Sequence, residues 1–285
     1  MFAPRSSARH KLHSVAIDNP RSPRVRAVAK LAKKSRRHDA KMFLVEGPQA
    51  LREALTHRPE GVIDVFVTEA ARTKHSDVVD LAEAAGIDVE VVNEEVLEQM
   101  ADTGTPQGVI GVQDMFETNL AAVVAQSPRL VVLLDRVSDP GNAGTIIRVA
   151  VAAGADAVIV TDESVDIYNP KVVRSTTGSL FHLPIVTGVG LSEAMDALRG
   201  VGLQIVAADT SGDSLPDVAA AGGLAHPTVW LLGNEAHGLS DEVLGQCDRV
   251  VSVPQYGPVE SMNLATAAAV CIYQSAFSLH SHTPA

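Results

Sequence analysis

Two hydrophobic periods alternate along the chain, and each change of period marks a new element. Short runs that are apolar at every position indicate strands buried on both faces, whereas apolar residues three and four apart indicate helices that cover them. The first part predicts strands at 42–45, 61–67, 89–92 and 109–113 and helices at 48–56, 76–85 and 94–100. The second predicts strands at 130–134, 157–160, 204–207 and 228–232, a short strand ending at 253–254, and a final helix from about 263. This alternation predicts an α/β fold with two domains, the second built on a parallel sheet.

Changes of composition mark the domain boundaries. Residues 1–19 are rich in Arg, Ser and His, with no acidic residue before Asp18, so we expect a flexible basic arm, although a mitochondrial targeting segment shares that composition. We predict a first domain over 20–115, a partly helical linker over 116–128 and a second domain over 129–285.

The composition excludes several classes of protein. With 46% hydrophobic residues among 285, the chain can bury a core, unlike a disordered chain. Cys247 and Cys271 lie far apart and form no Cys-x-x-Cys motif, so we expect a reducing compartment, the cytoplasm. The most apolar stretch, 264–277, contains polar residues and falls short of the roughly 20 apolar residues that span a membrane, so we expect no membrane partner.

Charge is unevenly distributed. A net charge of −11 argues against a nucleic-acid partner if it is evenly spread. Residues 1–58, however, hold fourteen Lys or Arg against four Asp or Glu, which gives this region +10 and leaves −21 for the rest. A basic N-terminal region on an acidic body is typical of a protein that binds a polyanion at one end.

A basic stripe is predicted on the first helix, which Ser22 caps and Pro23 begins. Basic residues recur on one face of that helix at spacings of four, three and four, an arrangement that can bind a phosphate backbone. They are Arg26, Lys30, Lys33 and Arg37. A solvated basic helix without a partner has the same composition, and both interpretations stay open.

Segment 131–150 places a glycine-containing loop between a buried strand and a helix. Such a loop binds dinucleotides in Rossmann folds, and Asp162 lies near the position that binds the ribose. The spacing Gly141-x-x-Gly144 departs from Gly-x-Gly-x-x-Gly, however, and Arg148 lies where a dinucleotide fold needs only close packing. A nicotinamide-dependent enzyme is therefore kept only as an alternative.

Three motifs, in order, resemble those of the SpoU/TrmH family, the SPOUT-class RNA ribose 2′-O-methyltransferases. They are Asn142-x-Gly144 with Arg148, LLGNEAHGLS at 231–240 and VPQYGPVESMNLATA at 253–267. The segment MFLVEGPQA at 42–50 resembles the family's small α/β RNA substrate-binding domain. The resemblance implies that a C-terminal SPOUT methyltransferase domain follows it, with a parallel sheet and a deep trefoil knot, a feature that periodicity could not have shown.

The resemblance implies methylation of a ribose 2′-hydroxyl in RNA by S-adenosylmethionine, with 23S ribosomal RNA favoured over transfer RNA. A noncatalytic RNA-binding protein on the same fold is the other alternative. The reaction requires alignment of the hydroxyl with the methyl group and help in removing a proton. Arg148 is expected to hold the phosphate beside the ribose and stabilise negative charge. The family also assigns this arginine the role of base, which suits a permanently protonated guanidinium poorly.

The resemblance also implies roles for other residues. One group is expected to orient the ribose, the cofactor or Arg148, or to shape the pocket floor: Asn142, Glu235, Ser261 and Asn263. A second group is expected to bind the cofactor: Thr210, Gly233, Asn234, Val253 and Met262. In this group, Val253 stands where the family commonly has Ile, and Met262 stands where it commonly has Leu. Lys171 and Arg174 are expected to contact RNA phosphates. Plain structural roles compete with these, since glycines suit a turn and Ser or Asn suits a helix cap.

The sites of this family lie near a dimer interface, where the partner subunit can contribute the arginine. The resemblance therefore implies a homodimer, with the apolar last helix as its interface or, equally well, as a buried core helix. No metal is expected, because His10, His13, His280 and His282 lie in probable tails and His237 lies in a motif loop without ligand partners.

Overall fold

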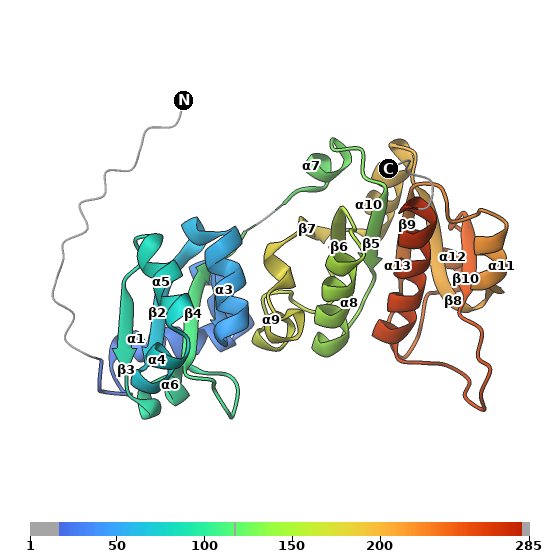
Figure 1. The fold of residues 1–285 in the computed structure, drawn as a ribbon. Helices are drawn as coiled ribbons and strands as arrows, with labels where there is room; N and C mark the ends of the chain where they lie inside the picture. Colours follow the sequence, from blue (N-terminus) through green and yellow to red (C-terminus); the bar gives the residue numbers. More distant parts are fainter. Residues whose placement is uncertain (1–16, 117, 281–285) are drawn as a thin grey trace.

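The computed structural model of the chain describes residues 17–116 and 118–280. Most of the predicted basic arm, including His10 and His13, and also His282 lie outside the described residues. Two sheets lie side by side along the molecule, each with its own helices (Figure 1). The chain is therefore an α/β protein with two sheet-based units, as the pattern predicts.

The N-terminal sheet has four strands in the order β1-β4-β2-β3. β1 and β2 each pair antiparallel with β4, whereas β2 and β3 are parallel. The strands are β1 (Met42–Glu46), β2 (Val62–Thr68), β3 (Val89–Val92) and β4 (Val109–Asp114). The helices are α1 (Pro23–Ala29), η1 (Lys30–Ala32), α2 (Lys34–Ala40), α3 (Pro48–His57), η2 (Pro59–Gly61), α4 (Glu69–Lys74), α5 (Ser76–Ala84) and α6 (Glu94–Met100).

The predicted basic helix is not continuous, so that prediction is wrong. α1 begins as expected, with the Ser22 hydroxyl accepting from the Val25 amide, but helical structure is interrupted at Lys33, whose backbone is extended (φ −93°, ψ 130°). Residues 33–39 are all polar, so a continued helix would have had no apolar face to bury there. Instead α2 turns back, and Arg37 donates to the carbonyl oxygens of Leu31 and Ala32 at 2.9 and 2.7 Å.

The C-terminal sheet is entirely parallel, as predicted, with its six strands in the order β10-β8-β9-β5-β6-β7. The strands are β5 (Leu130–Leu134), β6 (Ala157–Thr161), β7 (Ile185–Val189), β8 (Gln204–Ser214), β9 (Thr228–Leu232) and β10 (Arg249–Ser252). The helices are α7 (Leu120–Val124), α8 (Pro140–Ala152), α9 (Pro170–Thr176), η3 (Ser179–Phe181), α10 (Leu191–Gly200), α11 (Leu215–Ala220), α12 (Asp241–Leu244) and α13 (Leu264–His280). β7 was not predicted from the sequence.

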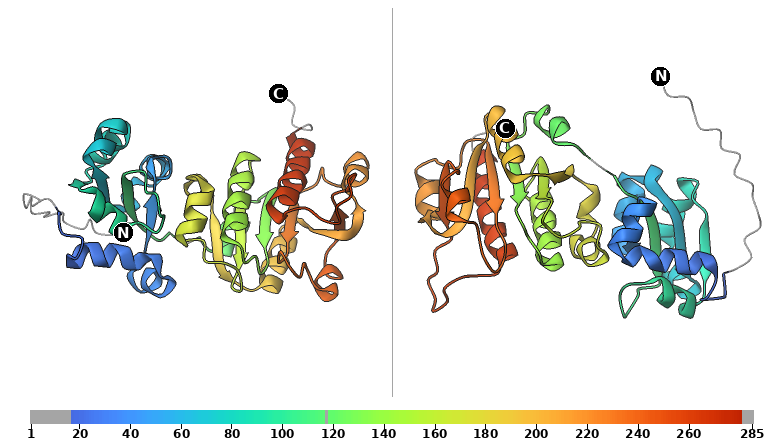
Figure 2. Two further views of the ribbon diagram at one scale, coloured as in Figure 1. Left: turned by 90° about the horizontal axis from the view of Figure 1, so that it is seen from below. Right: turned by 180° about the vertical axis from the view of Figure 1, so that it is seen from behind.

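Helices cover both faces of this sheet (Figure 2). Every residue of β5 is buried: Val132 and Leu134 pack in the core beneath α8 and α13, and Val131 and Leu133 pack in the core beneath α10. This two-sided burial is why the strand is apolar at every position. No described helix has the length and apolarity needed to cross a membrane.

The pairing of β8 with β10 is interrupted by a bulge in β8. Along β10 the partner of Val250 is Ala207, whereas the partner of Val251 is Asp213, so residues 208–212 bulge out of the pairing. At the base of the bulge, a Cβ added to Gly212 would lie 2.4 Å from the carbonyl carbon of Val250, so these two backbones touch. The knot implied by the family resemblance stays a prediction.

The two domains share an apolar interface. Phe43 of β1 lies against Tyr168 and Phe181 of the C-terminal domain, with ring centroids 4.7 and 6.4 Å apart, and Phe116 completes the aromatic group. Beside it, the Arg37 guanidinium pairs with Asp166 at 2.5 Å, and both side chains are buried. Apolar and ionic contacts thus fix the domains against each other.

Candidate active site

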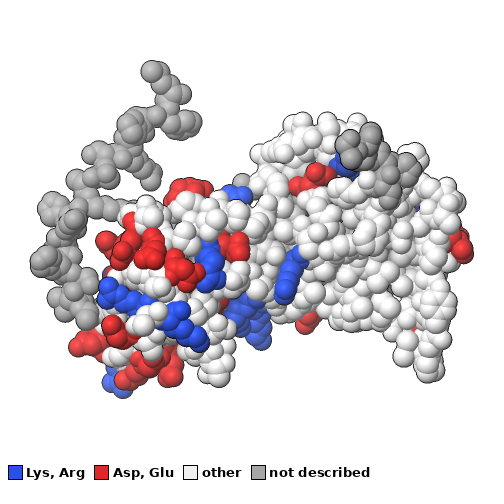
Figure 3. Space-filling view, viewed as in Figure 1, with Lys and Arg blue, Asp and Glu red and all other residues white. Residues whose placement is uncertain are grey.

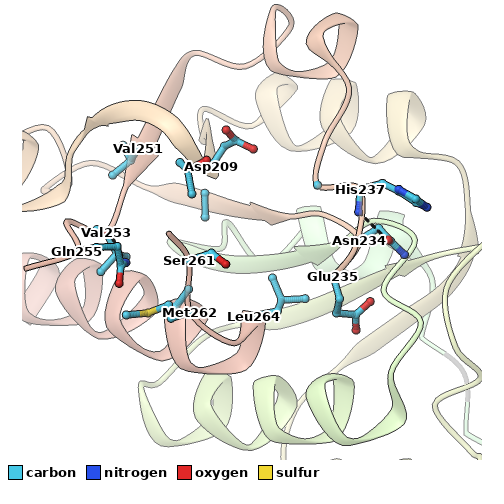
Figure 4. A pocket seen from close by; sticks show the side chains of 14 residues that line it. Asp209, Asn234, Glu235, His237, Val251, Val253, Gln255, Ser261, Met262 and Leu264 are labelled. Carbon is cyan, nitrogen blue, oxygen red and sulfur yellow. Dashed lines mark hydrogen bonds between the residues drawn. The ribbon is translucent and has the colours of Figure 1, made fainter. Parts of the chain in front are cut away.

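A cavity of about 350 Å³ lies at the carboxyl ends of β8 and β9, the edge at which parallel α/β sheets commonly bind ligands. Its walls come from the β8 bulge, the loop after β9, the end of β10 and the start of α13 (Figure 4). Among the sequence-predicted residues, those that line it are Thr210, Asn234, Glu235, Val253, Ser261 and Met262. Gly233, Asn142, Asn263 and Arg148 do not line it.

Several lining residues were not predicted from the sequence, among them the acidic Asp209. It lies in the β8 bulge, where its carboxylate accepts from the amide and hydroxyl of Ser211 at 2.9 and 2.8 Å. The predicted strand stops at residue 207 because the apolar run gives way to the polar stretch DTSGDS. That abrupt change at a strand's carboxyl end was the available signal. Gln255 and His237 were also not assigned to the pocket.

Gly233 shapes the loop after β9 without entering the cavity. A Cβ added there would lie 2.7 Å from the carbonyl carbon of Gly238, so only glycine permits the loop to fold back this tightly. Asn234 stabilises the same loop, since its side-chain oxygen accepts from the amides of Ala236 and His237 and its amide group donates to the carbonyl of Arg136. The loop is thus a preformed wall of the cavity.

Glu235 joins that loop to the segment leading into α8. Its carboxylate accepts from the amide and hydroxyl of Ser138, both at 3.0 Å, from the amide of Asp139 at 2.9 Å and from the side chain of Asn142 at 3.1 Å. Partial burial acts to raise the pKa of Glu235, but these hydrogen bonds outweigh it and lower the pKa from 4.5 to about 2. Glu235 is therefore ionised at neutral pH.

A hydrogen-bonded chain links all three motifs. The side-chain amide of Asn263 donates to the side-chain oxygen of Asn142 at 2.8 Å, and Asn142 in turn donates to Glu235. Asn263 also accepts from the amide of Thr266, so it caps α13 as well as holding Asn142. The capping role and the site role therefore coexist.

Arg148 is exposed on α8 and lies away from the cavity of its own chain. Its guanidinium donates to the Thr177 hydroxyl at 3.3 Å, beyond the end of α9. It is six residues beyond Asn142, which places it about 9 Å farther along the helix axis on a different face. Gly144, on the face of Arg148, allows this approach, since a Cβ there would lie 2.5 Å from Ser175 of α9. The structure does not bring Arg148 and the cavity together within one chain.

The predicted RNA-binding residues of the N-terminal domain divide into two groups. Arg26, Lys30, Lys33 and the additional Lys34 are exposed, and none forms an ion pair with another described residue; we call these four the basic cluster. Arg37 is 1% exposed and paired with Asp166, so the prediction that it lies on an exposed stripe is wrong. On the face shown in Figure 3, Lys and Arg gather mainly over the N-terminal domain among Asp and Glu.

Lys171 and Arg174 of α9 border a shallow groove beside the first turn of α8. Lys171 is exposed there. Arg174 instead reaches across to the N-terminal domain, where it pairs with Glu46 at 2.7 Å and Asp102 at 3.0 Å. Of the two predicted phosphate contacts, only Lys171 has a side chain free of ion pairs with the described residues.

The histidines do not match the expectation that they offer no metal-binding geometry. Within the described part of the chain, Glu53, His57 and His182 place one ligand atom each within 4.8 Å of one another. The three residues are far from the cavity motifs in the sequence, and two of them belong to the other domain.

Comparisons with known proteins agree with this arrangement. Residues 129–273 match the SpoU rRNA Methylase family, and residues 44–118 match the RNA 2′-O ribose methyltransferase substrate binding family. The chain is 34% identical to the 23S rRNA (guanosine(2553)-2′-O)-methyltransferase RlmP of Bacillus subtilis over 90% of this chain and 97% of that protein. It is 33% identical to the 23S rRNA (uridine(2479)-2′-O)-methyltransferase of Streptomyces viridochromogenes over 87% and 86% of the two chains.

Solved structures show the same similarity. The AdoMet-bound rRNA methyltransferase from Sinorhizobium meliloti matches with a TM-score of 0.79 and 29% identity, covering 91% of this chain and 96% of that one. The SpoU methyltransferase AviRb from Streptomyces viridochromogenes, in complex with the cofactor AdoMet, matches with a TM-score of 0.78 and 31% identity over 91% and 100%.

Proposed function

This chain belongs to the SpoU rRNA Methylase family, and on that premise we propose that the cavity between β8, β9 and α13 is where it methylates a ribose 2′-hydroxyl of 23S ribosomal RNA. The protein is an S-adenosylmethionine-dependent RNA ribose methyltransferase. The observation that carries the assignment of the site is the chain Glu235–Asn142–Asn263, which joins residues up to 121 positions apart directly beside the cavity.

The residues present fit S-adenosylmethionine. The cavity volume is within the usual range for small-molecule sites, and its walls mix apolar side chains with polar groups. The glycine-dependent loop exposes backbone along one side, and we assign Thr210, Asn234, Val253 and Met262 to the cofactor. Asp209 adds a carboxylate that can accept hydrogen bonds from the hydroxyl or ammonium groups of the cofactor. The cofactor supplies a methyl group already activated on a sulfonium sulfur.

Because the methyl group is activated, the protein mainly has to align the ribose hydroxyl and assist loss of its proton. Glu235 is a poor base for that proton, since its pKa of about 2 leaves the carboxylate only weakly basic. We assign Glu235 and Asn263 to positioning Asn142, whose amide faces both of them. We assign Ser261 to the cavity floor and Arg148 to the phosphate beside the ribose.

We further propose a homodimer in which Arg148 of one subunit completes the cavity of the other. Two observations support it. Arg148 is exposed outside its own cavity, and α13 leaves Val270 and Phe277 42% and 61% exposed, seven residues apart on one face. The opposite face of α13 is buried in the core, so the core role and the proposed interface role are compatible in one helix.

Mixing two inactive variants tests this arrangement. Arg148→Ala keeps a sound cavity, whereas Gly233→Val damages the cavity and keeps the arginine. If the arginine acts across the interface, random reassociation restores about a quarter of wild-type activity, because half of the dimers then hold one complete site. If activity stays absent although a tagged copy of one variant co-purifies the other, Arg148 acts within its own chain. A monomer at micromolar concentration contradicts the dimer itself.

We assign RNA binding to the basic cluster on the N-terminal domain and to Lys171 beside α8, both exposed and free to contact phosphates. We place the activity in the cytoplasm. The two free thiols support a reducing compartment. Burial raises the pKa of Cys247 to about 11 and that of Cys271 to about 12, which keeps both protonated.

Transfer of labelled methyl groups from S-adenosylmethionine to separated 23S, 16S and transfer RNA tests the function. We expect label in 23S RNA, at one ribose whose 3′ bond resists alkaline cleavage. Label in transfer RNA alone identifies a tRNA methyltransferase instead. RNA binding without transfer to any fraction identifies a noncatalytic protein, and calorimetry with NAD in place of S-adenosylmethionine tests the remaining alternative.

A further inference from the structure

A cluster of two histidines and one glutamate lies at the edge of the interface between the domains. Glu53 and His57 come from α3 of the N-terminal domain, and His182 follows η3 of the C-terminal domain. Oε2 of Glu53 lies 2.9 Å from Nε2 of His182 and 3.4 Å from Nε2 of His57. The two imidazole rings have centroids 4.1 Å apart. Three potential metal ligands therefore converge from two domains.

The donor atoms suit a transition metal. Two imidazole nitrogens and one carboxylate oxygen form a donor set that Zn²⁺ prefers, whereas Mg²⁺ and Ca²⁺ favour oxygen ligands alone. Tetrahedral zinc with bonds of about 2.0–2.1 Å needs ligand atoms about 3.3 Å apart. The separations of 2.9 and 3.4 Å bracket that spacing, so small side-chain rotations suffice to admit the ion.

Neighbouring residues hold the cluster in place. Glu53 and His57 are one helical turn apart, which puts both side chains on the same face of α3. Gln49 donates to the other carboxylate oxygen of Glu53 at 2.7 Å and is itself held by Arg52, the kind of outer contact that orients metal ligands. Across the interface, Gly178 permits the close approach, since a Cβ there would lie 2.4 Å from Cγ of Glu53.

We propose that Glu53, His57 and His182 bind one Zn²⁺ ion per chain and that this ion ties the N-terminal domain to the methyltransferase domain. All three side chains are partly accessible to solvent, which gives the ion a path of entry. Because the ligands come from both domains, binding stabilises their present arrangement by mass action. The proposal does not depend on methyl transfer, and its test needs no RNA.

Calorimetric titration of the chelator-treated full-length protein with ZnCl₂ tests the site. The variants are Glu53→Gln and His182→Gln, which remove a ligand at nearly constant size, and His226→Gln is the matched control because His226 is exposed and outside the cluster. Wild type and His226→Gln should bind one more Zn²⁺ than the cluster variants, or bind it at least about tenfold more tightly. S-adenosylmethionine binding by each variant reports that it is folded.

Thermal unfolding provides the second readout. Zn²⁺ should raise the unfolding midpoint of wild type and of His226→Gln, and should leave that of His182→Gln unchanged. Equal Zn²⁺ stoichiometry and affinity in wild type and His182→Gln would overturn the proposal, because the binding would then belong to other histidines. Zn²⁺ binding at the cluster without a shift in the midpoint would overturn its role as a tie between the domains.

Discussion

Replacing Glu235 by glutamine tests the hydrogen-bonded network that joins the cavity loop to α8. The carboxylate accepts from two amides, one hydroxyl and Asn142. Glutamine keeps the shape of the side chain but turns one oxygen into an NH₂ group that faces donors. At least one of these donors then loses its partner, and the ionic character of the remaining hydrogen bonds is lost.

The lowered pKa gives the magnitude. A pKa of about 2 in the folded protein, against 4.5 for an unperturbed group, corresponds to about 3.4 kcal/mol of stabilisation. The side chain is substantially exposed, so solvent screening reduces this to about 1–2 kcal/mol. Because the folded-state pKa is lowered, this stabilisation is complete above about pH 4.5 and is lost as the pH falls toward about 2.

Urea unfolding of wild type and Glu235→Gln at several pH values between 7 and 3 measures the stabilisation that the Glu235 carboxylate contributes. The single tryptophan, Trp230, is fully buried in the C-terminal domain and reports its unfolding by fluorescence. We expect wild type to be more stable by about 1–2 kcal/mol at pH 7, with the gap narrowing below pH 4.5. Glu83→Gln, an exposed change on α5, should show no gap. A gap that is absent, or unchanged from pH 7 to pH 3, would refute the reasoning.

Three further predictions concern the loop, the basic cluster and the domain interface. Gly233→Ala should lower S-adenosylmethionine affinity at least about tenfold in calorimetry, since the added Cβ meets backbone atoms. Gly190→Ala is the control and should leave the affinity unchanged, because its Cβ meets open space. Equal losses of affinity in the two variants would contradict the loop argument. Neutralising the basic cluster should weaken RNA binding and reduce the slope of log affinity against log salt by about 3; an unchanged slope would place the RNA elsewhere. Arg37→Met should leave the salt dependence of RNA binding unchanged. It should destabilise the protein by about 3–5 kcal/mol in urea unfolding, because it leaves Asp166 buried without its partner. Wild-type stability of this variant would show that the ion pair contributes nothing.

The sequence predicted those features that depend on local pattern. β5 and β9 could be located because burial on both faces makes each residue apolar, and the order of the three motifs located the cavity walls. β8 was predicted only as far as Ala207, although it extends to Ser214, because its bulge is polar and breaks the apolar run. Asp209 was missed for that reason.

Contacts between distant segments could not be predicted in this way. Arg37 was predicted to be one more exposed cation, since nothing near it in the chain indicates a partner 129 residues away. The histidine cluster was missed on the same grounds, because His182 and Glu53 are brought together only by packing of the domains. The motif spacing placed Arg148 near Asn142 in the sequence, but helix geometry separates the two and leaves Arg148 outside its own cavity.

The most direct test of the central claim compares methyl transfer and cofactor binding in one variant. Single-turnover transfer from labelled S-adenosylmethionine to 23S RNA should be measured for wild type and Arg148→Ala, alongside calorimetric affinity for S-adenosylmethionine. We predict unchanged affinity, because Arg148 does not line the cavity and is assigned to the RNA phosphate rather than to the cofactor, and transfer at least about 100-fold slower, as expected when a group that stabilises transition-state charge is removed. Transfer by Arg148→Ala at the wild-type rate would contradict the claim.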